Sequence, residues 1–252
     1  MLEPTVQALT TRVVLASGSP RRHEIIKNLG INAECIPSTY DENLDRARYK
    51  THGEYVQDLA YYKVQEVFQR LKNDQKSPEL IIGADTIVTM GETIYGKPKD
   101  KADAFRILNN LKNKEHEVFS GVCLKTRNKE VKFFESTKVT FGDVSEEQIR
   151  AYIATGEPMD KAGGYGIQGI GGCLIKKING DYYTFLDTLC FRRGKVGLWA
   201  VNSIRNVYGY PARLRSTLDI VRRSSIHKSV HSRWRKASLK FVDGRSLGAL
   251  NT

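Results

Sequence analysis

Residues 155–169, TGEPMDKAGGYGIQG, combine chemically reactive side chains with residues that form turns. The segment contains two acids, one lysine, one amide and five glycines, which are Glu157, Asp160, Lys161, Gln168, Gly156, Gly163, Gly164, Gly166 and Gly169. Glycines let a backbone bend sharply and approach a ligand closely, and carboxylates beside a lysine suit a phosphate bridged by a metal ion. The segment therefore predicts a polyphosphate site.

Residues 17–22, SGSPRR, form a second group of this kind. Ser19 and Pro20 are typical of an N-cap and of the first residue of a helix. Free backbone N–H groups and the helix dipole, joined by the guanidinium groups of Arg21 and Arg22, would make an anion cradle there. The alternative is an ordinary capped helix start in solvent. No GxxxxGK[ST] pattern occurs, which excludes the P-loop machinery of common ATPases.

Asp85 lies in the apolar run 80–88, which we expect to be a buried strand. A carboxylate there is costly to bury, so it should be paired, metal-bound or catalytic. The alternative is that Asp85 caps a nearby turn. Lys63 and Lys97 carry charges that could reach a phosphate, whereas an isolated lysine is usually a solvated surface charge.

The elements that must position these side chains alternate along the chain. Apolar runs predict strands at 13–16, 80–88, 118–124, 131–141 and 173–178. Helical spacing and capping signals predict helices from Pro20 to about 29, at 52–71, from the cap Asp100 to about 111, and from Ser145 to near 155. The pattern favours an α/β fold.

Together these segments resemble the Maf-like nucleoside triphosphate pyrophosphatases, which cut between the α and β phosphates. The matching segments are LASGSPRR at 15–22, Glu42, Lys63 in LAYYK, GADTIV at 83–88, GKP at 96–98, GEPMDKAGGYGIQG at 156–169 and NGDYY at 179–183. Within that family, Arg22, Thr86 and Gln168 match positions that mark the dTTP- and UTP-preferring subgroup. The resemblance implies an elongated mixed β-sheet with flanking helices in two lobes around a substrate cleft, and usually a homodimer.

The resemblance also implies a role for each matched residue. Hydrolysis of a phosphoanhydride needs charge neutralisation, a positioned water and an in-line leaving group, which implies a divalent cation, Mg²⁺. Asp85 would be the general base, and Glu42, Glu157 and Asp160 would hold the metal. Phosphate oxygens would be bound by Ser17, Arg21, Lys63, Lys97 and Lys161. The pyrimidine or its surroundings would be read by Arg22, Thr86 and Gln168.

Composition fits a globular protein of 252 residues with 40% hydrophobic content. The four cysteines are far apart and form no CxxC pair, so we expect buried free thiols and a reducing compartment. The N-terminus lacks the features of a signal peptide, and no run of about eighteen apolar residues occurs. These observations predict a cytoplasmic protein with no membrane span.

The match to the family is interrupted after Tyr183 and resumes at NVYGYP, residues 206–211. We therefore expect a domain over 1–223 with an insertion at 184–205. The alternative is that everything from 184 is unrelated to the family. Residues 1–183 hold 26 Lys and Arg against 25 Asp and Glu, whereas residues 184–252 hold 14 against 3, so the net charge of +12 divides into +1 and +11.

The C-terminal residues 224–252 are basic, and we expect a disordered tail. The alternative is attraction to RNA or to acidic surfaces. Two functions therefore compete at this point. The first is an active pyrophosphatase that hydrolyses dTTP, UTP and related pyrimidine nucleotides, and the second is a catalytically impaired relative that binds partners through its basic tail.

Overall fold

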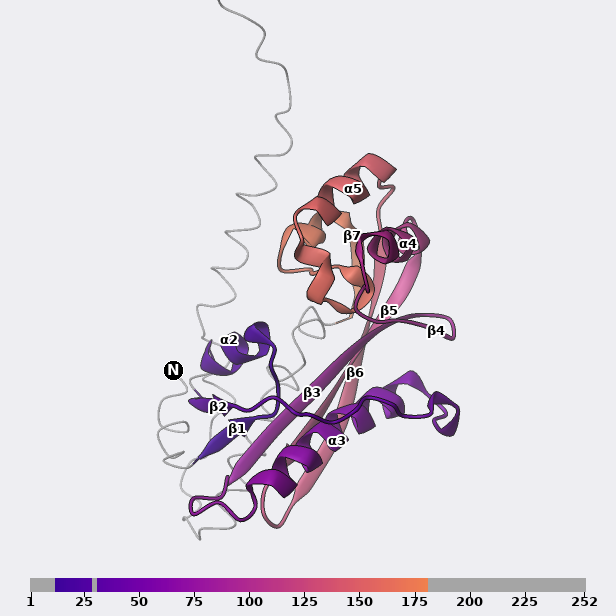
Figure 1. Cartoon of the computed structure of the whole chain (residues 1–252). Coiled ribbons are helices and arrows are strands. Elements are labelled where there is room, and N and C mark those ends of the chain that lie inside the picture. The colour runs from indigo at the N-terminus through magenta and orange to yellow at the C-terminus, as the bar shows by residue number, and fades with distance from the viewer. Residues whose placement is uncertain (1–11, 29–30, 181–252) are drawn as a thin grey trace, which may run out of the picture. The chain divides into compact units, whose positions relative to one another are not determined.

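The strands of the computed structural model form one mixed sheet (Figure 1). The structure describes residues 12–28 and 31–180. In these residues the sheet has seven strands, in the order β2-β1-β3-β5-β6-β7, with β4 beside β3. Their bounds are β1 Val13–Leu15, β2 Ala33–Cys35, β3 Leu80–Met90, β4 Thr93–Tyr95, β5 Glu115–Lys125, β6 Glu130–Phe141 and β7 Ile175–Asn179.

Strand direction confirms the predicted mixed sheet. Strand β1 runs parallel to β2 and β3, whereas β3, β4, β5, β6 and β7 pair antiparallel. The long strands β3 and β5 pair from Ile81 opposite Lys125 to Thr89 opposite Glu117. This ladder is the frame on which the candidate site is built.

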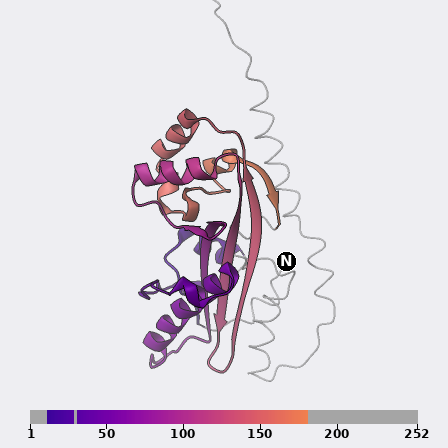
Figure 2. The ribbon, with the colours of Figure 1, turned by 90° about the vertical axis from the view of Figure 1, so that its right-hand side faces the viewer.

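Helices flank the sheet, and they begin at the capping residues that the sequence supplies. Their bounds are α2 Pro20–Asn28, α3 His52–Leu71, α4 Lys101–Leu111 and α5 Glu146–Ala154. Thr51 and Glu54 form a capping box at α3, Ser145 and Gln148 form one at α5, and Asp100 caps α4. Figures 1 and 2 both show α4 and α5 near one end of the long strands and α3 near the other.

Alternation along β3 and β5 assigns their side chains to different helices. Val88 and Val118 pack in a cluster with residues of α4 and α5, whereas their neighbours Ile87 and Phe119 pack with residues of α3. Successive side chains of a strand point to opposite faces, so one pair of strands supports both groups of helices. Gly121 lets α3 lie close, because a Cβ there would overlap the carbonyl of Val56.

Several details differ from the sequence-based expectations. The last strand begins at Ile175, not at 173, because Cys173 belongs to the 3-10 helix η4, Ile170–Leu174. Strands β2 and β4 were not predicted, since three residues are too few to show a period. The three described cysteines are free, but only Cys123 is buried. Burial was the wrong prediction for Cys35, which ends the edge strand β2, and for Cys173.

Some expectations concern residues outside the described ranges. These are the insertion at 184–205, the resumed match at 206–211, the basic tail at 224–252, Cys190 and the end of the NGDYY segment. Across the described ranges, none of the helices has both the length and the apolar composition that spanning a bilayer requires.

Candidate active site

The candidate site lies where one edge of β3 is open between two shorter strands. Strand β1 pairs with β3 at 80–82 and β4 pairs with it at 88–90, while β5 follows the opposite edge from 81 to 89. Among the described strands, none pairs with β3 at 83–87 on the first edge. Asp85 and Thr86 lie in this interval. The loop after β1 and the loop after β4 therefore both start beside this unpaired interval of β3.

Asp85 is the acid of a three-membered ionic cluster. The Nζ atom of Lys63, on α3, lies 2.6 Å from Oδ1 of Asp85 and 2.7 Å from Oε1 of Glu42. The side chain of Asp85 is 11% exposed and that of Lys63 is 12% exposed, whereas that of Glu42 is 56% exposed. Asp85 is thus buried and paired within its strand, as the sequence predicted, and it does not cap a turn.

Burial raises the pKa of the Asp85 carboxyl above its ordinary value. The charges of Lys63 and Arg22 oppose this effect, and the Glu42 carboxylate adds to it. Burial by itself lowers the pKa of Lys63, but its two carboxylate partners outweigh burial and raise it. A carboxylate with a raised pKa that keeps a cation beside it has the properties of a general base.

The loop after β1 brings a hydroxyl and a guanidinium group to this cluster. Ser17 is 6% exposed, and its Oγ accepts hydrogen bonds from the backbone N–H of Ser19 and from Nη1 of Arg22, each at 3.2 Å. Since Arg22 also acts electrostatically on Asp85, the predicted cradle and the predicted base lie together. Thr86, next to Asp85, shares a hydrogen bond of 3.0 Å with Ser120 on β5.

The glycine-rich segment folds into two 3-10 helices, η2, Glu157–Asp160, and η3, Ala162–Gly164. Oδ2 of Asp160 lies 4.0 Å from Nη2 of Arg21 on α2, which joins this segment to the loop after β1. Lys161 donates from Nζ to Oδ1 of Asp160 and to the backbone oxygen of Glu157, each at 2.6 Å. Gly163, at a φ of 70°, provides the turn that the sequence predicted.

Two other predicted residues lie on exposed loops. Lys97 is exposed, and the carbonyl of its neighbour Gly96 accepts a hydrogen bond of 3.0 Å from the N–H of Gly163. Gln168 is exposed beside Ile167, which is only 6% exposed. The loop of Lys97 is therefore bonded to the glycine-rich segment that contains Gln168, and both polar side chains remain accessible.

The three carboxylates predicted to bind metal have different surroundings. Glu42 contacts Lys63, Asp160 contacts Lys161 and Arg21, and Glu157 contacts backbone N–H groups. Within the ranges that the structure covers, no three His, Cys, Asp or Glu side chains group as a metal cluster. Mg²⁺ is usually held by one or two carboxylates together with substrate phosphates. The accessible carboxylate of Glu42 fits that mode of binding.

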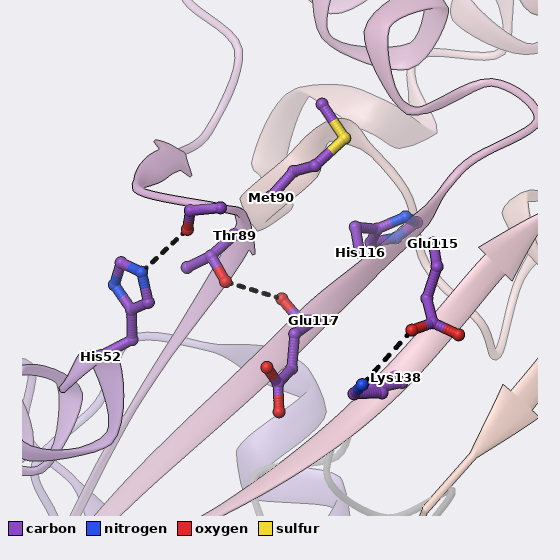
Figure 3. Close-up of a pocket in the computed structure, with 8 residues that line it drawn as sticks. His52, Thr89, Met90, Glu115, His116, Glu117 and Lys138 are labelled. Carbon is purple, nitrogen blue, oxygen red and sulfur yellow. Dashed lines mark hydrogen bonds and ion pairs between the residues drawn. The ribbon is translucent and has the colours of Figure 1, made fainter.

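A cavity of about 200 Å³ lies elsewhere on the sheet, and none of the predicted site residues lines it (Figure 3). Several of its polar groups bond to one another. Nε2 of His52 is 3.0 Å from the carbonyl of Gly91, and Lys138 is 3.4 Å from Glu115. With these polar groups already paired, we do not assign the cavity to a substrate.

Two functional candidates were missed from the sequence, Ser120 and Tyr152. Ser120 is fully buried in β5 and bonded to Thr86, and a serine in an apolar run was the available signal. Tyr152 on α5 donates a hydrogen bond of 3.0 Å to Glu157. The predicted helix from Ser145 to near 155 includes Tyr152, but its sequence pattern gives no indication of that partner.

Curated relatives match the same part of the chain. A human protein named as a probable bifunctional dTTP/UTP pyrophosphatase/methyltransferase is 48% identical over 185 residues, which are 69% of this chain but only 30% of the human protein. A Bacillus anthracis protein named dTTP/UTP pyrophosphatase is 43% identical over 173 residues, covering 69% of this chain and 87% of that protein.

Among solved structures, the Staphylococcus aureus Ham1 protein matches with a TM-score of 0.36 and 15% identity, covering 53% of this chain and 73% of that one. The model of the family described as Maf-like protein matches residues 12–186, which include every predicted site residue. The chain therefore belongs to the Maf-like protein family.

Proposed function

We propose that this protein is a nucleoside triphosphate pyrophosphatase that hydrolyses dTTP and UTP to the monophosphate and pyrophosphate. The observation that carries the proposal is the Lys63–Asp85–Glu42 cluster at the open edge of β3, in a member of the Maf-like family. The relatives named dTTP/UTP pyrophosphatase support the substrate, since the match covers 87% of the Bacillus anthracis protein. Lys63 and Arg22, which come from two separate segments, act electrostatically on Asp85 at this edge, and binding of a polyphosphate requires such cations.

In the proposed reaction, a water molecule beside Asp85 attacks the α-phosphorus. The water oxygen forms the new P–O bond, and its proton passes to a carboxylate oxygen of Asp85. The bond between the α-phosphorus and the bridging oxygen breaks, and the electron pair leaves with pyrophosphate. Lys63 keeps Asp85 oriented through the 2.6 Å contact. The raised pKa makes this carboxylate a better proton acceptor than a solvated one.

The remaining predicted residues bind the substrate in this proposal. Ser17, Arg21, Lys97 and Lys161 hold phosphate oxygens, and Arg22, Thr86 and Gln168 face the pyrimidine or its surroundings. A site that hydrogen-bonds a base discriminates more strongly than shape alone. Mg²⁺, held by Glu42 and the substrate phosphates, would neutralise charge on the triphosphate. Asp160 would contribute through water, because its side chain is 67% exposed.

Three broader statements, of which only the homodimer is implied by the family resemblance, complete the proposal. The protein acts in the cytoplasm, it forms a homodimer, and its basic residues 224–252 provide any contact with nucleic acid. The charge distribution supports the last statement, since residues 224–252 hold six Lys and Arg against one Asp, a net charge of +5.

The test is release of pyrophosphate from dTTP and UTP with Mg²⁺ by the full chain and its variant Asp85→Asn. We expect the variant to lose activity by about 10²- to 10⁴-fold, as expected when a general base is removed. Asp143→Asn is the matched control, because Asp143 is exposed and distant in sequence from every predicted site residue. Equal activity of the Asp85 variant and the wild type would reject the proposed base.

A further inference from the structure

The carboxylate of Glu157 is held by three hydrogen bonds from its own polypeptide. Its Oε1 accepts from the hydroxyl of Tyr152 at 3.0 Å and from the backbone N–H of Gly171 at 3.1 Å. Its Oε2 accepts from the backbone N–H of Ile170 at 2.9 Å. A carboxylate has about four acceptor positions, so most of them are used by these three donors, one from α5 and two from the segment that follows Glu157.

The same segment closes tightly around the Tyr152–Glu157 pair. The hydroxyl of Tyr152 also accepts a hydrogen bond of 3.3 Å from the N–H of Gly166. A Cβ on Gly169 would lie 2.5 Å from Oε2 of Glu157, and one on Gly171 would lie 2.5 Å from the Tyr152 hydroxyl oxygen. A side chain at Gly169 would therefore displace the Glu157 carboxylate, and one at Gly171 would also meet the backbone N of Gly166 at 2.8 Å.

We propose that Tyr152 and Glu157 are positioning residues that fix the loop of residues 166–171, and that Glu157 serves this purpose and does not bind metal. The bonds reach residues on both sides of Gln168, at Gly166 and at Ile170. The loop therefore presents Gln168, which is exposed, in one orientation. The role of Gln168 in reading the nucleobase rests on the proposed function.

The environment of Glu157 agrees with this role. Although burial alone raises its pKa, hydrogen bonds from Gly171, Ile170 and Tyr152 outweigh burial and lower it. The carboxylate is thus kept ionised by fixed donors, and a metal ion at the same oxygens would have to displace them. Glu42, by contrast, contacts the amine of Lys63 and keeps an accessible carboxylate. In this proposal Glu42 binds the metal, and Glu157 positions the loop.

The experiment compares Glu157→Gln and Tyr152→Phe with the wild type, using hydrogen exchange and kinetics together. We expect faster amide exchange over residues 166–171 in both variants. We also expect the KM for dTTP to rise by about 10-fold or more with a smaller change in kcat, as for loss of a hydrogen bond to a charged group. Discrimination between dTTP and dCTP should fall, while the Mg²⁺ concentration for half-maximal rate should stay within about twofold. Glu146→Gln, at an exposed acid on α5, is the control and should change none of these quantities.

Different results separate the possible failures. A large rise in the Mg²⁺ requirement of Glu157→Gln, with unchanged exchange in the loop, would overturn the inference and restore Glu157 as a metal ligand. Lower thermal stability with unchanged discrimination would also overturn it, because a merely structural role predicts that result. If the wild type releases no pyrophosphate, the proposed function fails. In that case dTTP binding by calorimetry and amide exchange over residues 166–171 test the inference. Weaker dTTP binding and faster exchange in the two variants than in the wild type would support it, and unchanged values would overturn it.

Discussion

Asp85 experiences opposing charges from residues that lie far apart in the sequence. Glu42 raises the pKa of its carboxyl, whereas Lys63 and Arg22 lower it, and burial raises it further. Each neighbour can be neutralised separately by an amide of similar size. The sign of each resulting shift is fixed by the charge that is removed, so the cluster can be tested residue by residue.

The pH dependence of kcat/KM should report these charges. Asp85 accepts a proton only when it is ionised, so activity should fall as the pH falls through its pKa. Lys63→Gln removes a cation and should move this acidic limb to higher pH, whereas Glu42→Gln removes an anion and should move it to lower pH. The measurement is hydrolysis of dTTP between about pH 4 and 9 at saturating Mg²⁺. Shifts in the same direction would contradict the assignment of Asp85 as the base.

The sequence could predict that Asp85 has a partner, but not which partner. A carboxylate in an apolar strand must be satisfied, and this follows from the residue type and its neighbours alone. Lys63 is 22 residues earlier on a helix, and only the packing of α3 against β3 brings its amine to 2.6 Å. Glu157 shows the reverse case: its residue type suggested a metal ligand, whereas its neighbours are backbone N–H groups.

At the scale of elements, the close packing of α3 on the sheet brings Lys63 to Asp85. Gly83 on β3 and Gly121 on β5 have no side chains to separate the helix from the strands. At Gly121 an added Cβ would overlap backbone atoms of Val56 and Gln57, which cannot rotate away as a side chain could. The position of the Lys63–Asp85–Glu42 cluster thus depends on Gly121, a residue that has no reactive side chain.

Gly121→Ala should therefore destabilise the protein and impair the site. We expect a loss of about 1–3 kcal/mol in the free energy of unfolding, as is typical of overpacking, together with lower kcat because α3 carries Lys63. Urea denaturation and dTTP hydrolysis measure the two effects. Gly142→Ala is the matched control, since a Cβ there would be 3.8 Å from its nearest neighbour, the Leu174 carbonyl. Equal stability of the two variants would show that α3 can move without cost.

Elements with strong local signals were predicted well, and short or irregular ones were not. Helix α3 occupies the predicted residues 52–71, because its period and its capping box agree. The 3-10 helices η2, η3 and η4 depend on glycines and on contacts between distant residues, so they cannot be predicted from a local sequence period. The sequence located the glycine-rich segment, but its internal bonds required the fold.

At the scale of the whole molecule, one histidine joins the core beneath the glycine-rich segment. His116 on β5 is 3% exposed, and its Nε2 lies 2.7 Å from the hydroxyl of Tyr165. Both rings meet Phe141 edge to face, with centroids 4.9 and 4.8 Å away. Tyr165 belongs to the segment that carries Lys161 and Gln168, so the stability of this core also supports the candidate site.

Protonation of His116 should make the protein sensitive to mild acid. Burial lowers its pKa from 6.5 to about 4, against a smaller opposing effect of the Lys114 backbone. The unfolded chain therefore binds a proton between these values that the folded protein does not, and stability is complete above pH 6.5 and declines as the pH falls toward 4. From pH 7 to 5 this decline should be roughly 2 kcal/mol.

Urea unfolding at both pH values should show a smaller decline in His116→Gln and an unchanged one in His23→Gln, because His23 is exposed. An equal decline in all three proteins would place the acid sensitivity elsewhere, because His116 is the buried histidine among the residues that the structure describes.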